Sequence, residues 1–143
     1  MGEQPQDATI RPFLMFEGKA EEALNYYLSV FPDGKLLEST RYGPGQVGKE
    51  GSVATAVFVV AGQTIMCSDS PVKHAFGFTP AFSLFVDCQS EAVFDRVWSA
   101  LSQECSVFMP PGDYGFSRWF GWLSDRYGVS WQISLRTSPR SER

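Results

Sequence analysis

Few residues of this 143-residue chain have side chains suited to acid–base chemistry. His74 is the sole histidine, and an imidazole with an ordinary pKa of about 6.5 can act as a general base. The alternative is a solvated linker residue, because no acidic partner that would orient the ring is evident in the sequence. The GxSxG, HExxH and P-loop patterns do not occur. His74 is therefore the one catalytic candidate, and whether the protein is an enzyme stays open.

An arginine among aromatic residues is the second feature that could bind a small molecule. Arg118, Trp119 and Trp122 lie in the sequence GFSRWFGW. Arg118 could hold an anionic ligand or stack on a ring, or it could be a plain surface arginine beside an aromatic core. Trp119 and Trp122 are three positions apart, so an unbulged strand would place them on opposite faces. Arg11 has the same ambiguity between a ligand contact and a salt bridge.

The remaining reactive types have simpler interpretations. Cys67, Cys88 and Cys105 are odd in number and lack C-x-x-C spacing, which favours small buried thiols in a reducing cytoplasm. A nucleophilic cysteine would need a basic neighbour to lower its pKa, and His74 is the only histidine available for this. Asp125, in the turn SDRYG, is predicted to bond nearby backbone amides rather than to catalyse.

Composition excludes several classes of protein. A net charge of −4 and a pI near 4.9 argue against a nucleic-acid binder. The start of the chain has no basic and apolar leader, and no apolar run approaches the roughly 20 residues that span a bilayer. Aromatic residues make up 15% of the chain, enough to fill a core or to line a cavity for a flat ligand. We therefore expect a cytoplasmic protein without a membrane partner.

The order of elements predicts an α+β protein built from a duplicated unit. Strand and helix patterns give β-α-β-β-β twice. Leu24, Leu28 and Phe31 on the first helix match Phe94, Trp98 and Leu101 on the second at an offset of 70. Ser90 is the expected N-cap of the second helix. The predicted strands cover 9–16, 35–42, the hairpin 52–68, 81–86, 106–109 and the hairpin 114–135, with a turn at 110–113.

The domain boundaries follow from this order. We expect a disordered start at 1–8, a first module at 9–69, a linker at 70–80, a second module at 81–136 and a frayed tail at 137–143. No predicted strand leads through a glycine-rich turn into a helix, so no Rossmann-type cofactor site is expected. Neither module is large enough to bury a full core alone, so we expect two modules packed into one small domain.

Three stretches resemble the vicinal oxygen chelate superfamily, also called the glyoxalase/bleomycin-resistance fold. They read PFLMFEGKAEEALNYYLSVFPDGK at 12–35, GFTPAFSLFVDC at 77–88 and FGWLSDRYGVSWQISL at 120–135. The chain is most similar to the PhnB-like branch, often labelled after a demethylubiquinone methyltransferase. The resemblance spans roughly residues 9–136. It implies two βαβββ modules that form a cup, commonly holding a metal and a small ligand, and it implies a homodimer.

The resemblance also tells where metal ligands would stand. The four positions fall near Arg11, near Met66 to Ser68, at about Ala81 and at Gln132. Divalent ions prefer imidazole, carboxylate or amide oxygen donors, and arginine repels a cation. Only Gln132 could contribute a donor, so we expect no divalent metal and no other cofactor.

Three functions remain. The first is a metal-free small-molecule-binding protein with Arg11, Arg118, Trp119, Trp122 and Gln132 at the ligand. The second is a lyase, isomerase or dioxygenase of the same superfamily that uses His74. The third is an antibiotic-sequestering binder, for which an acidic cup would favour cationic aromatic compounds.

Overall fold

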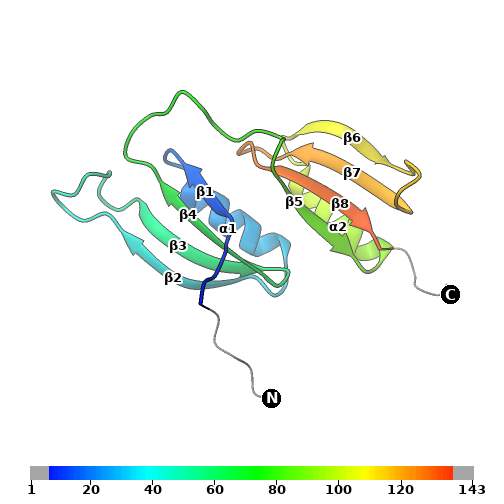
Figure 1. Ribbon diagram of the computed structural model, residues 1–143, viewed down its shortest axis with the longest axis horizontal. Helices are drawn as coiled ribbons and strands as arrows, with labels where there is room; N and C mark the ends of the chain where they lie inside the picture. Colours follow the sequence, from blue (N-terminus) through cyan, green and yellow to red (C-terminus); the bar gives the residue numbers. More distant parts are fainter. Residues whose placement is uncertain (1–6, 137–143) are drawn as a thin grey trace, which may run out of the picture. The chain divides into compact units, whose positions relative to one another are not determined.

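The chain separates into two compact units, which are described one at a time. The computed structural model describes residues 7–136. The expected frayed tail at 137–143 lies outside the described residues, as does the expected disordered start except for Asp7 and Ala8. The units are Met1–Lys73 and His74–Arg143, and the division falls inside the segment 70–80 (Figure 1).

The first unit is a four-stranded mixed sheet with one helix. Its strand order is β1-β4-β3-β2. Strand β1 pairs with β4 in parallel, and the other two pairings are antiparallel. The helix contacts β3 and β4 (Figure 1). The elements are β1 (Phe13–Phe16), α1 (Ala20–Val30), β2 (Lys35–Arg41), β3 (Val53–Val60) and β4 (Gln63–Asp69).

The second unit repeats this topology, which confirms the predicted α+β architecture of two βαβββ units. Its strand order is β5-β8-β7-β6, with β5 parallel to β8. The two antiparallel pairings are β6 with β7 and β7 with β8. The elements are β5 (Ser83–Cys88), α2 (Glu91–Leu101), β6 (Ser106–Gly112), β7 (Trp119–Ser124) and β8 (Ser130–Leu135).

One backbone hydrogen bond recurs in both units and aligns them residue by residue. The Ser70 amide donates to the Phe16 carbonyl at 2.7 Å, and the Arg136 amide donates to the Cys88 carbonyl at 2.7 Å. Superposing these two bonds pairs Phe13 with Phe85, Met66 with Gln132 and Asp69 with Leu135. The strand registers agree, because Phe13 lies opposite Met66 and Phe85 lies opposite Gln132.

The two helices begin by different means. Ser90 caps α2 as predicted, and its hydroxyl accepts the Val93 amide at 3.3 Å. Helix α1 has Lys19 at its N-cap position, which makes no capping bond. Asp69, at the end of β4, accepts the Gly18 and Ala20 amides at 2.8 and 2.9 Å instead. A carboxylate distant in sequence therefore satisfies the start of α1.

The core of each unit lies between its helix and its sheet. Phe94, Val97 and Leu101 form the buried stripe of α2, as the helical spacing predicts. Trp98 packs directly over Gly121 of β7. A Cβ atom at position 121 would lie 2.4 Å from the Trp98 ring, so this close approach requires glycine.

Three predicted boundaries are wrong for physical reasons. The segment 110–113 is no turn as a whole, because β6 continues through Pro110 and Pro111 to Gly112. Since β6 is an edge strand, prolines that cannot donate hydrogen bonds are tolerated there. The last hairpin begins at Trp119 rather than at Tyr114. The first strand begins only after Pro12, whose carbonyl accepts the Met66 amide at 2.9 Å.

Candidate functional site

The two tryptophans of β7 lie on opposite faces of the second sheet, as their spacing predicts. Strand β7 pairs with β8 without a bulge, so its side chains alternate. Gly121 faces α2, where Trp98 covers it, and Trp119 has the same parity. Trp122 therefore belongs to the other side, which we call the open face because it is turned away from α2. The sheet thus presents two candidate sites, one on each side.

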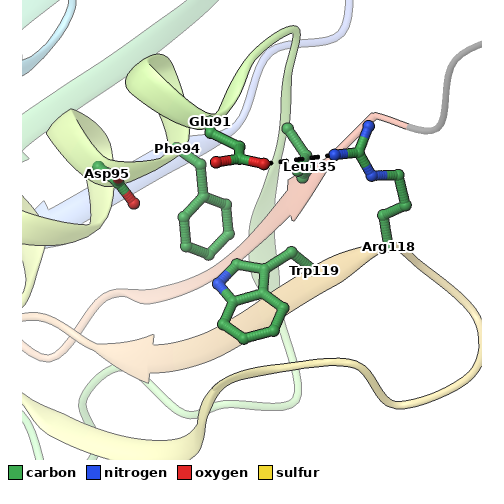
Figure 2. Close-up of a pocket in the computed structure, with 6 residues that line it drawn as sticks. All are labelled: Glu91, Phe94, Asp95, Arg118, Trp119 and Leu135. Atoms are coloured by element: carbon green, nitrogen blue, oxygen red, sulfur yellow. Dashed lines mark hydrogen bonds and ion pairs between the residues drawn. The ribbon is translucent and has the colours of Figure 1, made fainter.

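The first candidate, which we call the α2 pocket, lies between the start of α2 and strands β7 and β8. Its volume is about 320 Å³. Figure 2 shows the indole of Trp119 below the ring of Phe94, with Glu91 between Asp95 and Arg118. Two predicted ligand residues, Arg118 and Trp119, thus lie together. The pocket is lined by Glu91, Phe94, Asp95, Arg118, Trp119 and Leu135.

The charges of the α2 pocket are partly paired. A guanidinium nitrogen of Arg118 lies 3.4 Å from a carboxylate oxygen of Glu91. Both side chains are more than half exposed, so solvent weakens this ion pair. Asp95 makes no side-chain hydrogen bond or ion pair with the other described residues, and Trp119 is 41% exposed. The pocket therefore combines an accessible indole with a carboxylate that no cation neutralises.

The second candidate lies at the centre of the open face. Gln132 of β8 is opposite Phe85 of β5 on one side and Trp122 of β7 on the other. Phe85 is 57% exposed, whereas Gln132 and Trp122 are half-buried. The Gln132 carboxamide makes no hydrogen bond with another side chain in the range 7–136. A free amide between two aromatic rings can therefore fix the polar part of a flat ligand.

Hydroxyl groups hold the tryptophan of the open face in place. The indole Nε1–H of Trp122 donates to the Ser130 hydroxyl at 2.8 Å. Ser130 is 1% exposed and also lies 2.7 Å from the Ser83 hydroxyl. The Phe108 ring lies 5.0 Å from the Trp122 ring, centroid to centroid. This network orders the Trp122 ring before any ligand arrives, which lowers the rotamer entropy lost on binding there.

Arg11 belongs to the first unit. Its side chain is exposed, and a guanidinium nitrogen lies 3.9 Å from the Met66 sulfur. The alignment of the units makes Met66 the counterpart of Gln132 and Arg11 the counterpart of Ser83. Three of the predicted metal positions thus carry the guanidinium of Arg11, the thioether of Met66 and the amide of Gln132. The alignment moves the fourth from the predicted Ala81 to Ser83, which offers a hydroxyl. These donors do not fit a divalent ion, for which carboxylate or imidazole ligands are typical.

No other part of the described chain supplies a metal centre. Among residues 7–136, no group of three or more His, Cys, Asp and Glu side chains is placed to hold a metal ion.

His74 and the cysteines are not among the residues that line the α2 pocket, and none of them lies opposite Gln132 in the second sheet. The His74 ring is half-buried and stacks on Phe76 at a centroid distance of 4.8 Å. Cys67 and Cys88 are buried, and burial raises the pKa of each thiol to about 11. A thiol with so high a pKa is a poor nucleophile near neutral pH. Cys67 and Cys88 are therefore the small buried side chains that the sequence predicts, whereas Cys105 is only half-buried.

Several residues of these sites were missed by sequence reasoning. Phe85 was placed in a strand without a role, although its opposition to Gln132 depends on the parallel pairing of β5 with β8. Glu91 directly follows the N-cap Ser90, and an acid in the first turn of a helix is ordinary. Asp95 carries no signal in the sequence, because a single acid on a helix is ordinary. Pocket lining depends on residues distant in sequence, so no local signal could have found them.

The repeated βαβββ topology defines the class of this protein, that of the glyoxalase/bleomycin-resistance fold. A solved glyoxylase/bleomycin resistance protein/dioxygenase domain from Frankia sp. EAN1pec shares this fold at a TM-score of 0.64 and 14% identity. That match covers 94% of this chain and 95% of that chain. The family model for 3-demethylubiquinone-9 3-methyltransferase matches residues 8–134. The chain therefore belongs to this family, the PhnB-like branch of the vicinal oxygen chelate superfamily.

Two relatives illustrate the similarity of this chain to known proteins. The PhnB protein of Bacillus cereus, whose structure is solved, is 51% identical with a TM-score of 0.86. The match covers 90% of this chain and 99% of that chain. Protein YjdN of Escherichia coli K12 is 24% identical over 140 residues, covering 88% of this chain and 94% of that protein. Among the described residues, neither helix has the length and apolarity to cross a membrane.

Proposed function

We propose that the protein is a metal-free, small-molecule-binding member of its superfamily and that its ligand lies on the open face of the second sheet. The observation that carries this proposal is the unpaired carboxamide of Gln132 between the rings of Phe85 and Trp122. A carboxamide both donates and accepts hydrogen bonds, so it can fix one polar group of a ligand. The rings cover the apolar part.

The side chains at the metal positions support the metal-free part. Arg11 carries a permanent positive charge, and Met66 offers only a soft thioether. Gln132 alone cannot balance the charge of a divalent ion. The family description names a methyltransferase, but neither helix of the described chain follows a glycine-rich turn of the kind that binds a nucleotide-like cofactor. Binding without a resident cofactor is the function that these residues favour.

A ligand screen with matched variants tests the proposal. We expect planar aromatic amides and acids to raise the melting temperature, since a ligand at 100-fold over its Kd adds about 2.7 kcal/mol of stability. Gln132→Leu and Trp122→Leu should remove the shift. Gln103→Leu, an exposed glutamine of the same unit, is the control and should keep it.

Metal analysis of the purified protein tests whether it is metal-free. A stoichiometric divalent ion, whose removal abolishes ligand binding, would contradict the metal-free proposal. If the ligand raised the melting temperature of Gln132→Leu as much as that of the wild type, the ligand would not bind at the open face.

The α2 pocket favours a second candidate, an antibiotic-sequestering binder for cationic aromatic compounds. Trp119 offers an accessible indole face, which attracts cations, and Asp95 supplies a carboxylate without a partner. Thermal shifts with cationic aromatic compounds that vanish in Trp119→Leu, but persist in Trp122→Leu, would favour this candidate. The reverse pattern would reject it.

An enzyme of the lyase, isomerase or dioxygenase type remains the third candidate. His74 is its only identified base, and turnover that survives in His74→Ala would remove that support.

We also propose that the protein is a cytoplasmic homodimer. Strand β2 is an edge strand whose residues are all exposed, and such edges are often covered by a second chain. The three free cysteines suit a reducing compartment. Sedimentation at micromolar concentration should give twice the chain mass of 15.9 kDa, and a monomer would contradict the dimer.

A further inference from the structure

Two buried aspartates, one in each unit, have carboxylates in contrasting states. Asp69 and Asp125 are each 4% exposed. In Asp125, Oδ1 accepts the Tyr127 and Val129 amides, and Oδ2 accepts the indole N–H of Trp131 at 2.9 Å. Both oxygens of Asp125 therefore have hydrogen-bond donors.

Asp69 has donors at one oxygen only. Its Oδ1 accepts the Gly18 and Ala20 amides at the start of α1. Its Oδ2 accepts no hydrogen bond from any residue in the described range 7–136. The cap of helix α1 thus accounts for the hydrogen bonds of one carboxylate oxygen and leaves the other without a donor among the described residues. A buried carboxylate oxygen without a donor is costly, so it calls for a partner outside the described chain.

The protein provides space for such a partner. Asp69 lines a pocket of about 430 Å³ between the β1–α1 connection and the segment that precedes β3. The hydroxyl of Tyr42 donates to the Asp69 carbonyl at 3.0 Å, which holds the end of β4 in place. The alignment of the units puts Leu135 of the α2 pocket at the equivalent position. The equivalent position therefore carries a carboxylate in the first unit and an apolar side chain in the second.

The charge of this pocket selects a cation. Glu17, Glu50 and Asp69 contribute three carboxylates, and Lys49 contributes one ammonium group. Ser52 and Ser70 add hydroxyl groups to the lining. The negative charge of Asp69 acts on its neighbourhood, because it adds to burial in raising the pKa of the Cys67 thiol. No group of three potential metal ligands is formed by the described residues, so an organic cation fits better than a metal ion.

We propose that this pocket binds the primary ammonium group of a small organic amine, which donates a hydrogen bond to Oδ2 of Asp69. An ammonium group has three donors, and a hydrogen bond between two charged groups is stronger than a neutral one. The pocket volume lies within the range of small-molecule sites. The Asp69 pocket is built from residues of the first unit and the open face from residues of the second, so the two proposals are tested on different side chains and one can fail without the other.

Nuclear magnetic resonance titration of the full chain tests the proposal, with propylammonium chloride as the probe. We expect saturable shifts of the Gly18, Gly51 and Ser70 amides at neutral pH. Propanol, which has the same apolar part without the charge, should not produce them. Asp69→Asn keeps a carbonyl oxygen for the helix cap but loses the charge, so we expect affinity to fall about tenfold or more.

Further variants separate binding at the pocket from general charge effects. Glu50→Gln should weaken binding a few-fold, and it leaves the helix cap intact should Asp69→Asn fail to fold. Lys49→Gln should strengthen binding, because it removes a competing positive charge. Glu38→Gln, an exposed acid on β2 of the same unit, is the control and should change nothing. Shifts that never saturate, that appear equally with propanol or that persist unchanged in both Asp69→Asn and Glu50→Gln would overturn the proposal.

Discussion

Replacing Asp125 should unfold the second unit more readily than any surface change. Its carboxylate accepts hydrogen bonds from the Tyr127 amide, the Val129 amide and the Trp131 indole N–H, and the last two are buried. Asp125→Ala removes the hydrogen-bond acceptor of these two buried donors at about 1–3 kcal/mol each, so we expect a loss of about 2–6 kcal/mol. The Tyr127 amide is only partly buried and adds less, because water can reach it.

A second substitution isolates one of these bonds. In Asp125→Asn the amide oxygen can still accept the two backbone N–H groups, but its NH₂ group then faces the Trp131 indole donor. We expect this variant to lose about 1–3 kcal/mol. In a Trp131→Phe background the opposing donor is gone, so the same substitution should cost less. This difference is the coupling energy of a double-mutant cycle.

Urea unfolding followed by tryptophan fluorescence provides the measurement. All four tryptophans lie in the second unit, so the signal reports on that unit alone. Asp113→Asn, an exposed turn aspartate of the same unit, is the matched control and should stay within about 0.5 kcal/mol of wild type. A loss below about 1 kcal/mol in Asp125→Ala would refute the reasoning that these hydrogen bonds stabilise the second unit.

Two further predictions concern packing and thiol chemistry. Gly121→Ala should destabilise the second unit by about 1–3 kcal/mol, because its Cβ would overlap the Trp98 ring; Gly77→Ala, with open space around it, is the control in urea unfolding. Iodoacetamide should label Cys67 and Cys88 slowly at pH 8 and faster as the pH rises toward their pKa of about 11, because only the thiolate reacts. Fast labelling of either thiol in the folded protein, followed by mass spectrometry, would contradict this.

The sequence predicted the architecture because its signals are local. The apolar stripe of Phe94, Val97 and Leu101 has helical spacing, and Ser90 stands where a helix needs a cap. The residue types of Asp125 and Gly128 are enough to predict the turn that contains them. An aspartate can accept hydrogen bonds from the amides that follow it, and glycine adopts a positive φ without strain. Two copies of this pattern sufficed to predict the repeated unit.

The same local reasoning was wrong where an element's neighbours decide its structure. Pro110 and Pro111 were assigned to a turn, yet they lie in β6. Proline is excluded from central strands and tolerated on edges, and whether a strand is an edge depends on the whole sheet. Sequence spacing alone does not give that order.

The candidate sites were only partly predictable for a related reason. By itself the sequence determined which residue types exist for binding: Arg11, Arg118, two tryptophans and Gln132. The tertiary structure decided which other residues surround each of these side chains. It put Arg118 and Trp119 beside Glu91, but set Trp122 with Gln132 on the opposite face.

Asp69 shows most clearly what only the tertiary structure decided. In the sequence it is one acid at the end of a strand. Folding brings its carboxylate to the Gly18 and Ala20 amides, about fifty residues away in the sequence. It also buries the side chain, and one carboxylate oxygen accepts no hydrogen bond from the described residues. The strand pairing that creates this environment is non-local, because parallel β1 and β4 are joined through a helix and two further strands. Local patterns fix elements, and long-range pairing fixes the surroundings of each functional group.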